Sequence, residues 1–282
     1  MKITFEIYYH TRWGESLFLS GDIDELGANE ENRAVMMDYQ GDGLWKYTME
    51  LPASAKKFHY EYLVKSGEGI RREWGSPHSF SPGRNAGEYR LVDRWRDVPA
   101  NLPFYSSAFI QGIFFRQHAD SVVETIEQGT FTVKVDAPQL RPDERLVMVG
   151  DCPELGDWDV LKAPLLNDSA FPEWQITLDG RQLKFPFEYK FVIVRTHQRE
   201  VVAWETGENR ICREKPQNPS EAVVVSGLRF NGSESQWRGA GTAIPVFSLR
   251  SEAGFGVGEF HDLKLLIDWA AATGQRVLQL LP

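Results

Sequence analysis

Cysteine is scarce in this chain, and long apolar runs are missing. The two cysteines, Cys152 and Cys212, are too few for a disulfide-stapled fold and favour a reducing compartment, so we expect the cytoplasm. No apolar run approaches the roughly 20 residues of a membrane-spanning helix, and the first residues alternate like a strand rather than a signal peptide. The histidines are scattered without metal-ligand spacing. We therefore expect no membrane partner, no metal and no other cofactor.

Positive charge is also in short supply. The 282 residues carry 31 Lys and Arg against 40 Asp and Glu, a net charge of −9, which argues against nucleic acid as a partner. A neutral ligand such as a polysaccharide is indifferent to this sign. Nine tryptophans suit stacking on sugar rings, and packing in a core is the alternative explanation. The length suggests about two domains.

An internal repeat organises the chain. The segment 21–27, with its Gly-Asp and Leu-Gly pairs, recurs at 150–156, an offset of 129 residues. The same offset, within one residue, relates three aromatic pairs: Trp45 and Trp174, Tyr60 and Tyr189, and Trp74 and Trp204. Two copies of one domain therefore occupy most of the chain.

Each copy is a series of short alternating segments separated by turns. The predicted strands are Thr4–Tyr9, Ser16–Ser20, Trp45–Leu51, Lys57–Val64 and Glu88–Val92, then Thr130–Val135, Leu146–Gly150, Trp174–Leu178, Phe187–Val194 and Glu221–Val225. This pattern predicts a mainly β protein with two antiparallel, immunoglobulin-like β-sandwich modules in tandem, at 1–97 and 129–228. Residues 98–128, rich in proline at their start, form the predicted linker.

Two tryptophans stand in polar loops of the second copy. Trp158 closes a turn rich in Gly, Pro and Asp, and Trp204 is followed by Glu205 and Asn209. With Lys190 on a strand between them, these residues could offer flat faces and hydrogen bonds to a sugar. The alternative is that each residue has a structural role. The tryptophans would then pack in the core, the lysine would lie on a solvated face, and Glu205 and Asn209 would form turns.

The motifs around these residues resemble a known family. Val149-Gly150 followed by Leu155-Gly156-Asp157-Trp158, then Phe187-Glu188-Tyr189-Lys190-Phe191 and Ala203-Trp204-Glu205 with Asn209, are similar to the family 20 carbohydrate-binding modules, which bind starch. The resemblance implies an α-1,4-glucan site. It consists of Trp158, Lys190 and Trp204, with Glu205 and Asn209 as hydrogen-bonding neighbours.

The same pattern is degenerate in the first copy. Asn29 stands where Trp158 is expected and Glu61 where Lys190 is, although Trp74 is retained as the apparent counterpart of Trp204. The family has a second site built on aromatics, and for it the first copy offers Trp13 and Tyr39. Trp45 is a further candidate, but it alternates onto the predicted core face. We therefore expect the two copies to bind glucan through different sites, the first through its early aromatics and the second through the Trp158 site.

Residues 229–282 differ in character. A strand, a helix with Leu263, Leu266, Ile267 and Ala270 on one face, and a second apolar strand make a βαβ unit. The glycines at 254–258 do not match a phosphate-binding loop. The run from Pro245 to Ser251 and the closing Leu280-Leu281-Pro282 resemble the truncated N-terminal start of the (β/α)₈ catalytic barrel of family 77 4-α-glucanotransferases, in their disproportionating-enzyme-2 (amylomaltase-like) subgroup.

The resemblance implies a parent enzyme that transfers glucosyl units from maltose or malto-oligosaccharides to a polysaccharide by a retaining double displacement. The family's catalytic carboxylates lie downstream of the matched strands, so we expect the rest of the barrel beyond this span and assign no catalytic residue. Glu259 and Asp262 read as helix-start residues. The alternative is a β-sandwich interaction module that packs on a partner domain without binding sugar.

Overall fold

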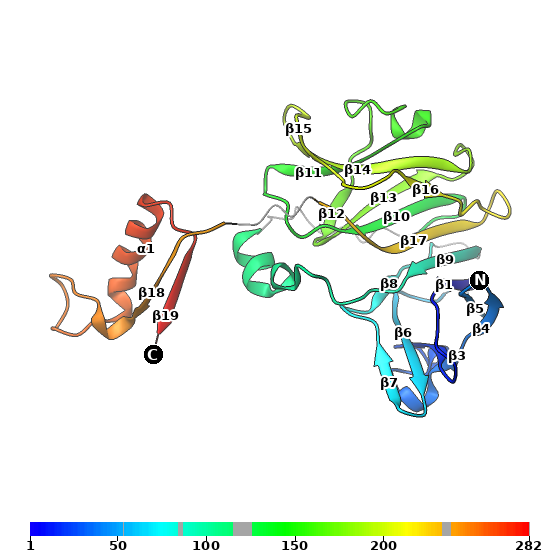
Figure 1. Cartoon of the computed structure of the whole chain (residues 1–282), viewed down its shortest axis with the longest axis horizontal. Coiled ribbons are helices and arrows are strands. Elements are labelled where there is room, and N and C mark those ends of the chain that lie inside the picture. The colour runs from blue at the N-terminus through cyan, green and yellow to red at the C-terminus, as the bar shows by residue number, and fades with distance from the viewer. Residues whose placement is uncertain (53, 84–86, 115–125, 233–237, 282) are drawn as a thin grey trace. The chain divides into compact units, whose positions relative to one another are not determined.

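The computed structural model describes residues 1–52, 54–83, 87–114, 126–232 and 238–281. It divides into two compact units, Met1–Gly232 and Ser233–Pro282 (Figure 1). The first unit contains both copies of the repeat, and each copy is a two-layer arrangement of mostly antiparallel strands. The predicted mainly β fold with tandem sandwiches is thereby confirmed.

The first module packs two sheets against each other. One layer contains β1, β5, β4 and β9, and the other contains β2, β3, β6, β7 and β8. Their bounds are β1 Lys2–Tyr8, β2 Ser16–Gly21, β3 Val35–Met36, β4 Asp38–Gly41, β5 Leu44–Glu50, β6 Phe58–Ser66, β7 Gly69–Arg72, β8 His78–Phe80 and β9 Glu88–Arg94. Alternate residues of these strands, such as Ile3, Phe5 and Ile7, are fully buried between the layers.

The second module repeats this plan. One layer contains β10, β12, β13 and β17, and the other contains β11, β14, β15 and β16. Their bounds are β10 Thr130–Asp136, β11 Glu144–Gly150, β12 Asn167–Ala170, β13 Glu173–Asp179, β14 Phe187–Arg195, β15 Val201–Trp204, β16 Arg210–Cys212 and β17 Ala222–Arg229. Short helices fill the connections: η1 Asp24–Leu26, η2 Glu31–Arg33, η3 Leu102–Tyr105, η4 Ala108–Ile113 and η5 Pro153–Leu155.

Equivalent turns confirm that the two modules are copies. The backbone N–H of His59 donates to Asp22 Oδ1 at 2.8 Å, and that of Glu188 donates to Asp151 Oδ1 at 2.9 Å. A Cβ at the glycine before either aspartate would collide with the carbonyl oxygen of the facing strand. The Gly-Asp pair is therefore fixed by a close backbone approach and by an acceptor for one orphan N–H.

The two modules share one sheet, which the sequence did not predict. Strand β9 of the first module pairs in parallel with β17 of the second, so that eight strands run in the order β12-β13-β10-β17-β9-β1-β5-β4. Figure 1 shows β9 and β17 side by side where the modules meet. The expected linker is thus accompanied by a direct strand-to-strand joint.

Each strand at this joint contributes to both hydrophobic cores. Leu91 of β9 and Val224 of β17 lie in the core of the first module, whereas Val92 and Val225 lie in the core of the second. Successive side chains of a strand point to opposite faces. The second layers of the two modules therefore cover opposite faces of the shared sheet.

Buried polar groups also join the modules. The Arg90 guanidinium lies 3.5 Å from Glu6 and 3.3 Å from Glu221 of the other module. Ser226 donates to Asp93 at 2.5 Å and lies 3.0 Å from the ring of His78. Removing one partner from such a buried network leaves a charge unpaired, which costs several kcal/mol of stability. The two strands therefore have little freedom to shift relative to each other.

The second unit is the predicted βαβ arrangement. Strands β18 (Gly241–Pro245) and β19 (Val277–Leu281) pair in parallel, and helix α1 (Leu263–Ala272) connects them, preceded by η6 (Val246–Ser248) and η7 (Phe260–Asp262). The N–H of Glu259 donates to Asp262 Oδ2 at 2.8 Å in a capping box, which confirms both as helix-start residues. Across the described part of the chain, no helix is long and apolar enough to cross a membrane.

Candidate functional site

The outer surface of the sheet formed by β11, β14 and β15 gathers the predicted site residues. Val192 of β14 is paired with Trp204 of β15, and Lys190 of β14 is paired with Val149 of β11. Directly opposed residues share a face, and so do residues two apart along a strand. Lys190 and Trp204 therefore lie on the same face of the sheet, with Val192 between them in register.

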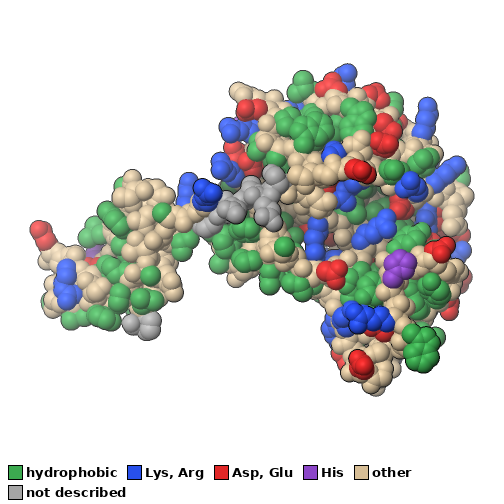
Figure 2. Space-filling model, in the orientation of Figure 1, with side chains coloured by type: hydrophobic (Ala, Val, Ile, Leu, Met, Phe, Trp, Pro, Cys, Tyr) green, Lys and Arg blue, Asp and Glu red, His purple; other side chains and the backbone are tan. Residues whose placement is uncertain are grey.

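Four valines form the floor of this site. Val147, Val149, Val192 and Val194 make a buried cluster with Ala163, and the half-buried ring of Trp158 packs against it. We call these four residues the valine face. The side chain of Trp204 is 42% exposed beside it, and Figure 2 shows hydrophobic side chains on the surface where Figure 1 draws β15. The structure thus brings Trp158, Lys190 and Trp204 together.

The turn that carries Trp158 is strained. Asp157 and Trp158 have φ of 49° and 64°, and the N–H of Trp158 donates to Gly150 O at 2.7 Å. The left-handed region is unfavourable for bulky side chains by about 1–2 kcal/mol. The equivalent residue of the first module, Asn29, has the same φ of 64°, and asparagine tolerates it well. Strain of this kind persists mostly at functional positions.

Lys190 supports the loop that follows Trp204. Its ammonium donates to Glu205 O at 3.1 Å and to Gly207 O at 2.6 Å. Asn209, on the same loop, donates from Nδ2 to Glu188 Oε2 at 2.9 Å and remains exposed. The lysine therefore holds the loop in place while its charge stays beside the aromatic pair.

Glu205 is buried in the second module, which corrects its expected role as a hydrogen-bonding neighbour of the sugar. The residue is only 3% exposed. Its carboxylate accepts hydrogen bonds from Arg210 and from the backbone N–H of Phe191. Buried carboxylates need such partners, and a sugar hydroxyl has no access to this one.

The counterpart of Trp204 in the first module is Arg72, not Trp74. Leu63 is paired with Arg72 as Val192 is paired with Trp204. The carboxylate of Glu73 accepts from Tyr62 N at 3.1 Å, as that of Glu205 accepts from Phe191 N.

The first module thus presents charged groups where the second presents aromatics. Arg72 forms ion pairs with Glu61 and Glu31 at the position of the aromatic site. Trp74 lies elsewhere. Its ring is 4.9 Å from that of Tyr105 and 5.3 Å from the guanidinium of Arg229, which belongs to the second module.

The second predicted site is only partly accessible. Trp13 extends fully into solvent, at 102% exposure, from the loop between β1 and β2, and Tyr39 on edge strand β4 is 56% exposed. Trp45 is buried at 6%, and its Nε1–H donates to Tyr9 O at 3.0 Å. Trp174 makes the equivalent bond to Ala137 O. Trp45 is therefore a core residue, which corrects its candidate role as a stacking surface.

Sequence reasoning missed the valine face and Arg210. The run Leu146-Val147-Met148-Val149 signals a strand that is buried on both sides, because apolar residues occupy both alternating sets. Met148 lies in the core and Val147 on the outer face. A strand in a two-layer module needs only one apolar face, so the second apolar set marks a covered surface.

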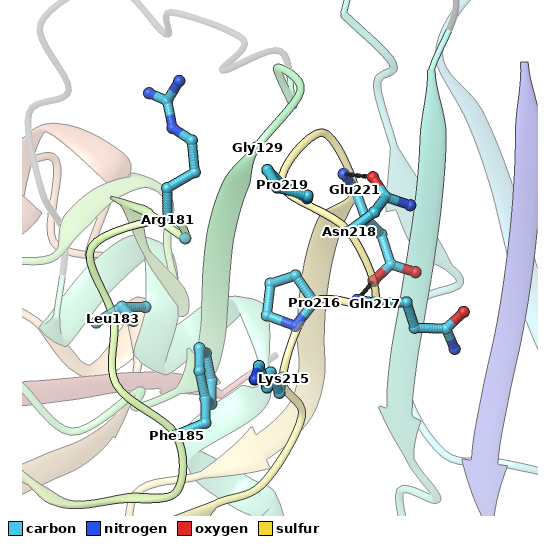
Figure 3. Close-up of a pocket in the computed structure, with 11 residues that line it drawn as sticks. Gly129, Arg181, Leu183, Phe185, Lys215, Pro216, Gln217, Asn218, Pro219 and Glu221 are labelled. Carbon is cyan, nitrogen blue, oxygen red and sulfur yellow. Dashed lines mark hydrogen bonds between the residues drawn. The ribbon is translucent and has the colours of Figure 1, made fainter.

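A separate cavity lies between the loops on either side of β14 and β16. It measures about 270 Å³ and includes Phe185, Pro216, Arg181 and Glu221 among its lining residues (Figure 3). The Arg181 guanidinium points away from the cavity and binds Asp179 in two places. Glu221 is engaged by Arg90. The charged groups of Arg181 and Glu221 are thus engaged within the protein.

Among the described residues, no group of three His, Cys, Asp or Glu side chains could hold a metal ion. Burial raises the pKa of the Cys152 thiol to about 11, so it is a neutral thiol at physiological pH. The arrangement is suited to binding through apolar faces and a few hydrogen bonds.

Two tryptophans and a lysine on the outer face of a small β-sandwich are typical of carbohydrate-binding modules. The comparison with known families agrees with this class. The starch binding domain family matches residues 1–84 and 128–223, and the chain belongs to it. Residues 244–282 match the 4-alpha-glucanotransferase family.

Individual relatives match either the whole chain or a part of it. A 4-alpha-glucanotransferase DPE2 from rice (Oryza sativa subsp. japonica) is 32% identical over the whole chain, which spans 31% of that protein. An AA13 family lytic polysaccharide monooxygenase A from Aspergillus terreus is 34% identical over 24% of this chain and 18% of its own length. A 4-alpha-glucanotransferase from Chlamydia trachomatis is 45% identical over 15% of this chain and 8% of its own.

Two solved structures are each similar to about a third of the chain. A family 20 carbohydrate-binding module of a maltotetraose-forming amylase from Pseudomonas saccharophila is 19% identical, with a TM-score of 0.28, over 34% of this chain and 99% of that one. A family 15 glucoamylase from Hypocrea jecorina is 22% identical, with a TM-score of 0.31, over 34% of this chain and 17% of that one.

Proposed function

We propose that the second module binds α-1,4-glucan through Trp158, Lys190 and Trp204, with Asn209 as a polar neighbour. The observation that carries the proposal is the register of the outer sheet. It places the lysine and Trp204 on one face, while the ring of Trp158 packs on the same valines. Family membership supports starch or glycogen as the class of polysaccharide.

The binding energy comes mainly from stacking. Covering one indole face with a sugar ring contributes about 1–2 kcal/mol net. Two faces and a few hydrogen bonds to hydroxyls give a dissociation constant in the range of about micromolar to millimolar. The first module would add a second contact through Trp13 and Tyr39, both of which are exposed.

For the whole protein we propose a retaining 4-α-glucanotransferase. The proposal is supported by the rice relative and by the match of the βαβ unit to the transferase family. In it, the sandwich modules tether the polysaccharide, and catalytic carboxylates supplied beyond the matched strands transfer glucosyl units from maltose or malto-oligosaccharides. A cytoplasmic location is part of the same proposal, and both cysteines of the described chain are unpaired thiols.

Calorimetry with maltoheptaose tests the binding site. Trp158→Ala and Trp204→Ala should each weaken binding at the second module at least tenfold, because each removes one stacking face. Trp74→Ala is the matched control, since that tryptophan contacts Tyr105 and Arg229 instead of the valine face, and its affinity should stay within twofold of wild type. Equal binding by the wild type and the Trp158/Trp204 double variant would reject the site. Absence of binding by the wild type would favour the interaction-module alternative.

A further inference from the structure

Glu205, which directly follows Trp204 in the chain, forms an ion pair with Arg210. Arg210 Nε lies 2.9 Å from Glu205 Oε1 and 3.0 Å from Oε2, and a second guanidinium nitrogen also bonds the carboxylate. The glutamate side chain is 1% exposed and that of the arginine 21%. The guanidinium also lies 5.5 Å from the ring centre of Phe191 in the core. A bidentate pair in this setting is both strong and directional.

The same carboxylate organises the backbone on either side of the binding loop. It accepts from Phe191 N at 3.2 Å on strand β14 and from Asn231 N at 3.3 Å. The N–H and hydroxyl of Thr206 both donate to Asn231 O, at 2.7 and 2.8 Å. The loop that begins at Trp204 is therefore fastened to the segment that leaves β17.

Arg210 completes this connection. A guanidinium nitrogen donates at 2.6 Å to the carbonyl oxygen of Arg229, the last residue of β17. Residues 229–231 are the last part of the second module before the chain continues towards the βαβ unit. We call residues 205–209 the Trp204 loop and residues 229–231 the exit segment. The ion pair thus connects three parts of the chain: β14, the Trp204 loop and the exit segment.

The first module provides an internal comparison. Glu73 occupies the position of Glu205: its carboxylate accepts from Tyr62 N at 3.1 Å, and its own N–H donates to Tyr62 O at 3.2 Å. It is buried and bonded to His78 at 3.1 Å and Arg96 at 2.9 Å. The first module has no aromatic pair at this face, and yet it keeps the buried glutamate and a basic partner. The glutamate is therefore an element of the module's architecture, and direct contact with sugar does not explain it.

We propose that Glu205 and Arg210 are positioning residues for glucan binding. This inference rests on the proposed function of the Trp158 and Trp204 site. The ion pair fixes the loop that presents Trp204 and Asn209, and it ties that loop to the exit segment at 229–231. Loop and exit segment consequently move together, so that glucan on the indole also orders residues 229–231.

Two isosteric or near-isosteric variants of the full chain test the pair. Glu205→Gln keeps the size and one acceptor but loses the charge, and Arg210→Lys keeps the charge but loses the planar fork. We expect the dissociation constant for maltoheptaose to rise about fivefold to tenfold in either variant. The double variant should bind maltoheptaose no more weakly than the weaker-binding single variant, because both residues act through one interaction. Glu73→Gln in the first module is the matched control and should leave this constant unchanged.

Hydrogen exchange separates positioning from direct contact. With wild-type protein, saturating maltoheptaose should slow exchange of the amides at 229–232, and this protection should be lost in both variants although Trp158 and Trp204 are intact. If Glu205→Gln weakens binding while Arg210→Lys does not, the glutamate contacts the sugar and the proposal is wrong. Unchanged affinity and protection in both variants would also overturn it. If the wild type fails to bind maltoheptaose, the proposed function itself fails. Should Glu205→Gln not fold, Arg210→Lys decides the question by the same two readouts.

Discussion

One residue decides whether the repeated turn carries an aromatic platform. Asn29 and Trp158 share the same left-handed backbone, and the turns around them are built from the same Gly-Asp and Leu-Gly pairs. Asparagine is well suited to that backbone, whereas tryptophan is strained there. The indole gains apolar contact with the valine face in return. At this one position the second module thus keeps a backbone conformation that asparagine occupies more readily in the first.

Asp136 at the end of β10 makes stability dependent on pH. Burial, and then the neighbouring charge of Glu173, raises the pKa of this carboxyl to about 6. Because the folded pKa lies above the unfolded one, folding carries no penalty below about pH 4. Stability is lost as the pH rises towards 6 and stays lower above it. Asp136→Asn should therefore raise the free energy of unfolding at pH 7.5 by about 1–2 kcal/mol more than at pH 4, after allowance for partial exposure. Urea denaturation at the two pH values measures this, and an equal effect at both would contradict it.

At the scale of elements, the parallel pairing of β9 with β17 makes the two modules one structural unit. Val92 belongs to the first module but is fully buried in the core of the second. Val92→Ala should lower the free energy of unfolding by about 2 kcal/mol through the cavity it leaves. The protein should still unfold in a single transition, followed by circular dichroism and by tryptophan fluorescence. Val64→Ala, buried only in the first core, is the comparison and should shift the same single transition. Two separate transitions in either variant would show that the modules unfold independently.

Local patterns predicted most elements but could not predict how distant elements meet. Alternation placed the strands, and the apolar stripe placed α1, because each depends on neighbours in sequence. The pairing of β9 with β17 leaves no such signal, since both strands are buried on two faces and are far apart in the chain.

The mistaken match of Trp74 with Trp204 has a similar cause. The β6–β7 hairpin closes between Ser66 and Gly69, whereas the β14–β15 hairpin closes between Val194 and Val201. The longer loop shifts the offset between the copies after that point, so Arg72 and not Trp74 is opposite the strand. The predicted sugar-binding role of Glu205 was wrong because its side chain is buried in an ion pair with Arg210. Such a contact cannot be read from sequence spacing.

At the scale of the whole tandem, the shared sheet sets the directions in which glucan can be held. The layer that carries Trp158 and Trp204 covers one face of the eight-stranded sheet, and the corresponding layer of the first module covers the other. Tyr39 lies on β4, the edge strand of this sheet and five strands from β10, roughly 24 Å away at the usual spacing. A joint made of paired strands and buried ions does not let the two proposed sites turn towards each other.

This geometry predicts that one tandem holds two separate glucan chains. The full chain should bind two molecules of maltoheptaose in calorimetry. It should also raise light scattering when mixed with a branched α-glucan such as glycogen, because each protein molecule bridges two branches. Trp204→Ala and Trp13→Ala should each leave one bound maltoheptaose and abolish the rise in scattering, since either loss removes one end of the bridge. Scattering that survives in both variants, or a single maltoheptaose bound by the wild type, would mean that the two faces do not act as independent sites. A flexible linker would instead let both sites engage one long chain and gain affinity through effective concentration. Because the joint between β9 and β17 is fixed, we expect the protein to bridge two glucan branches and not to gain affinity for a single long chain.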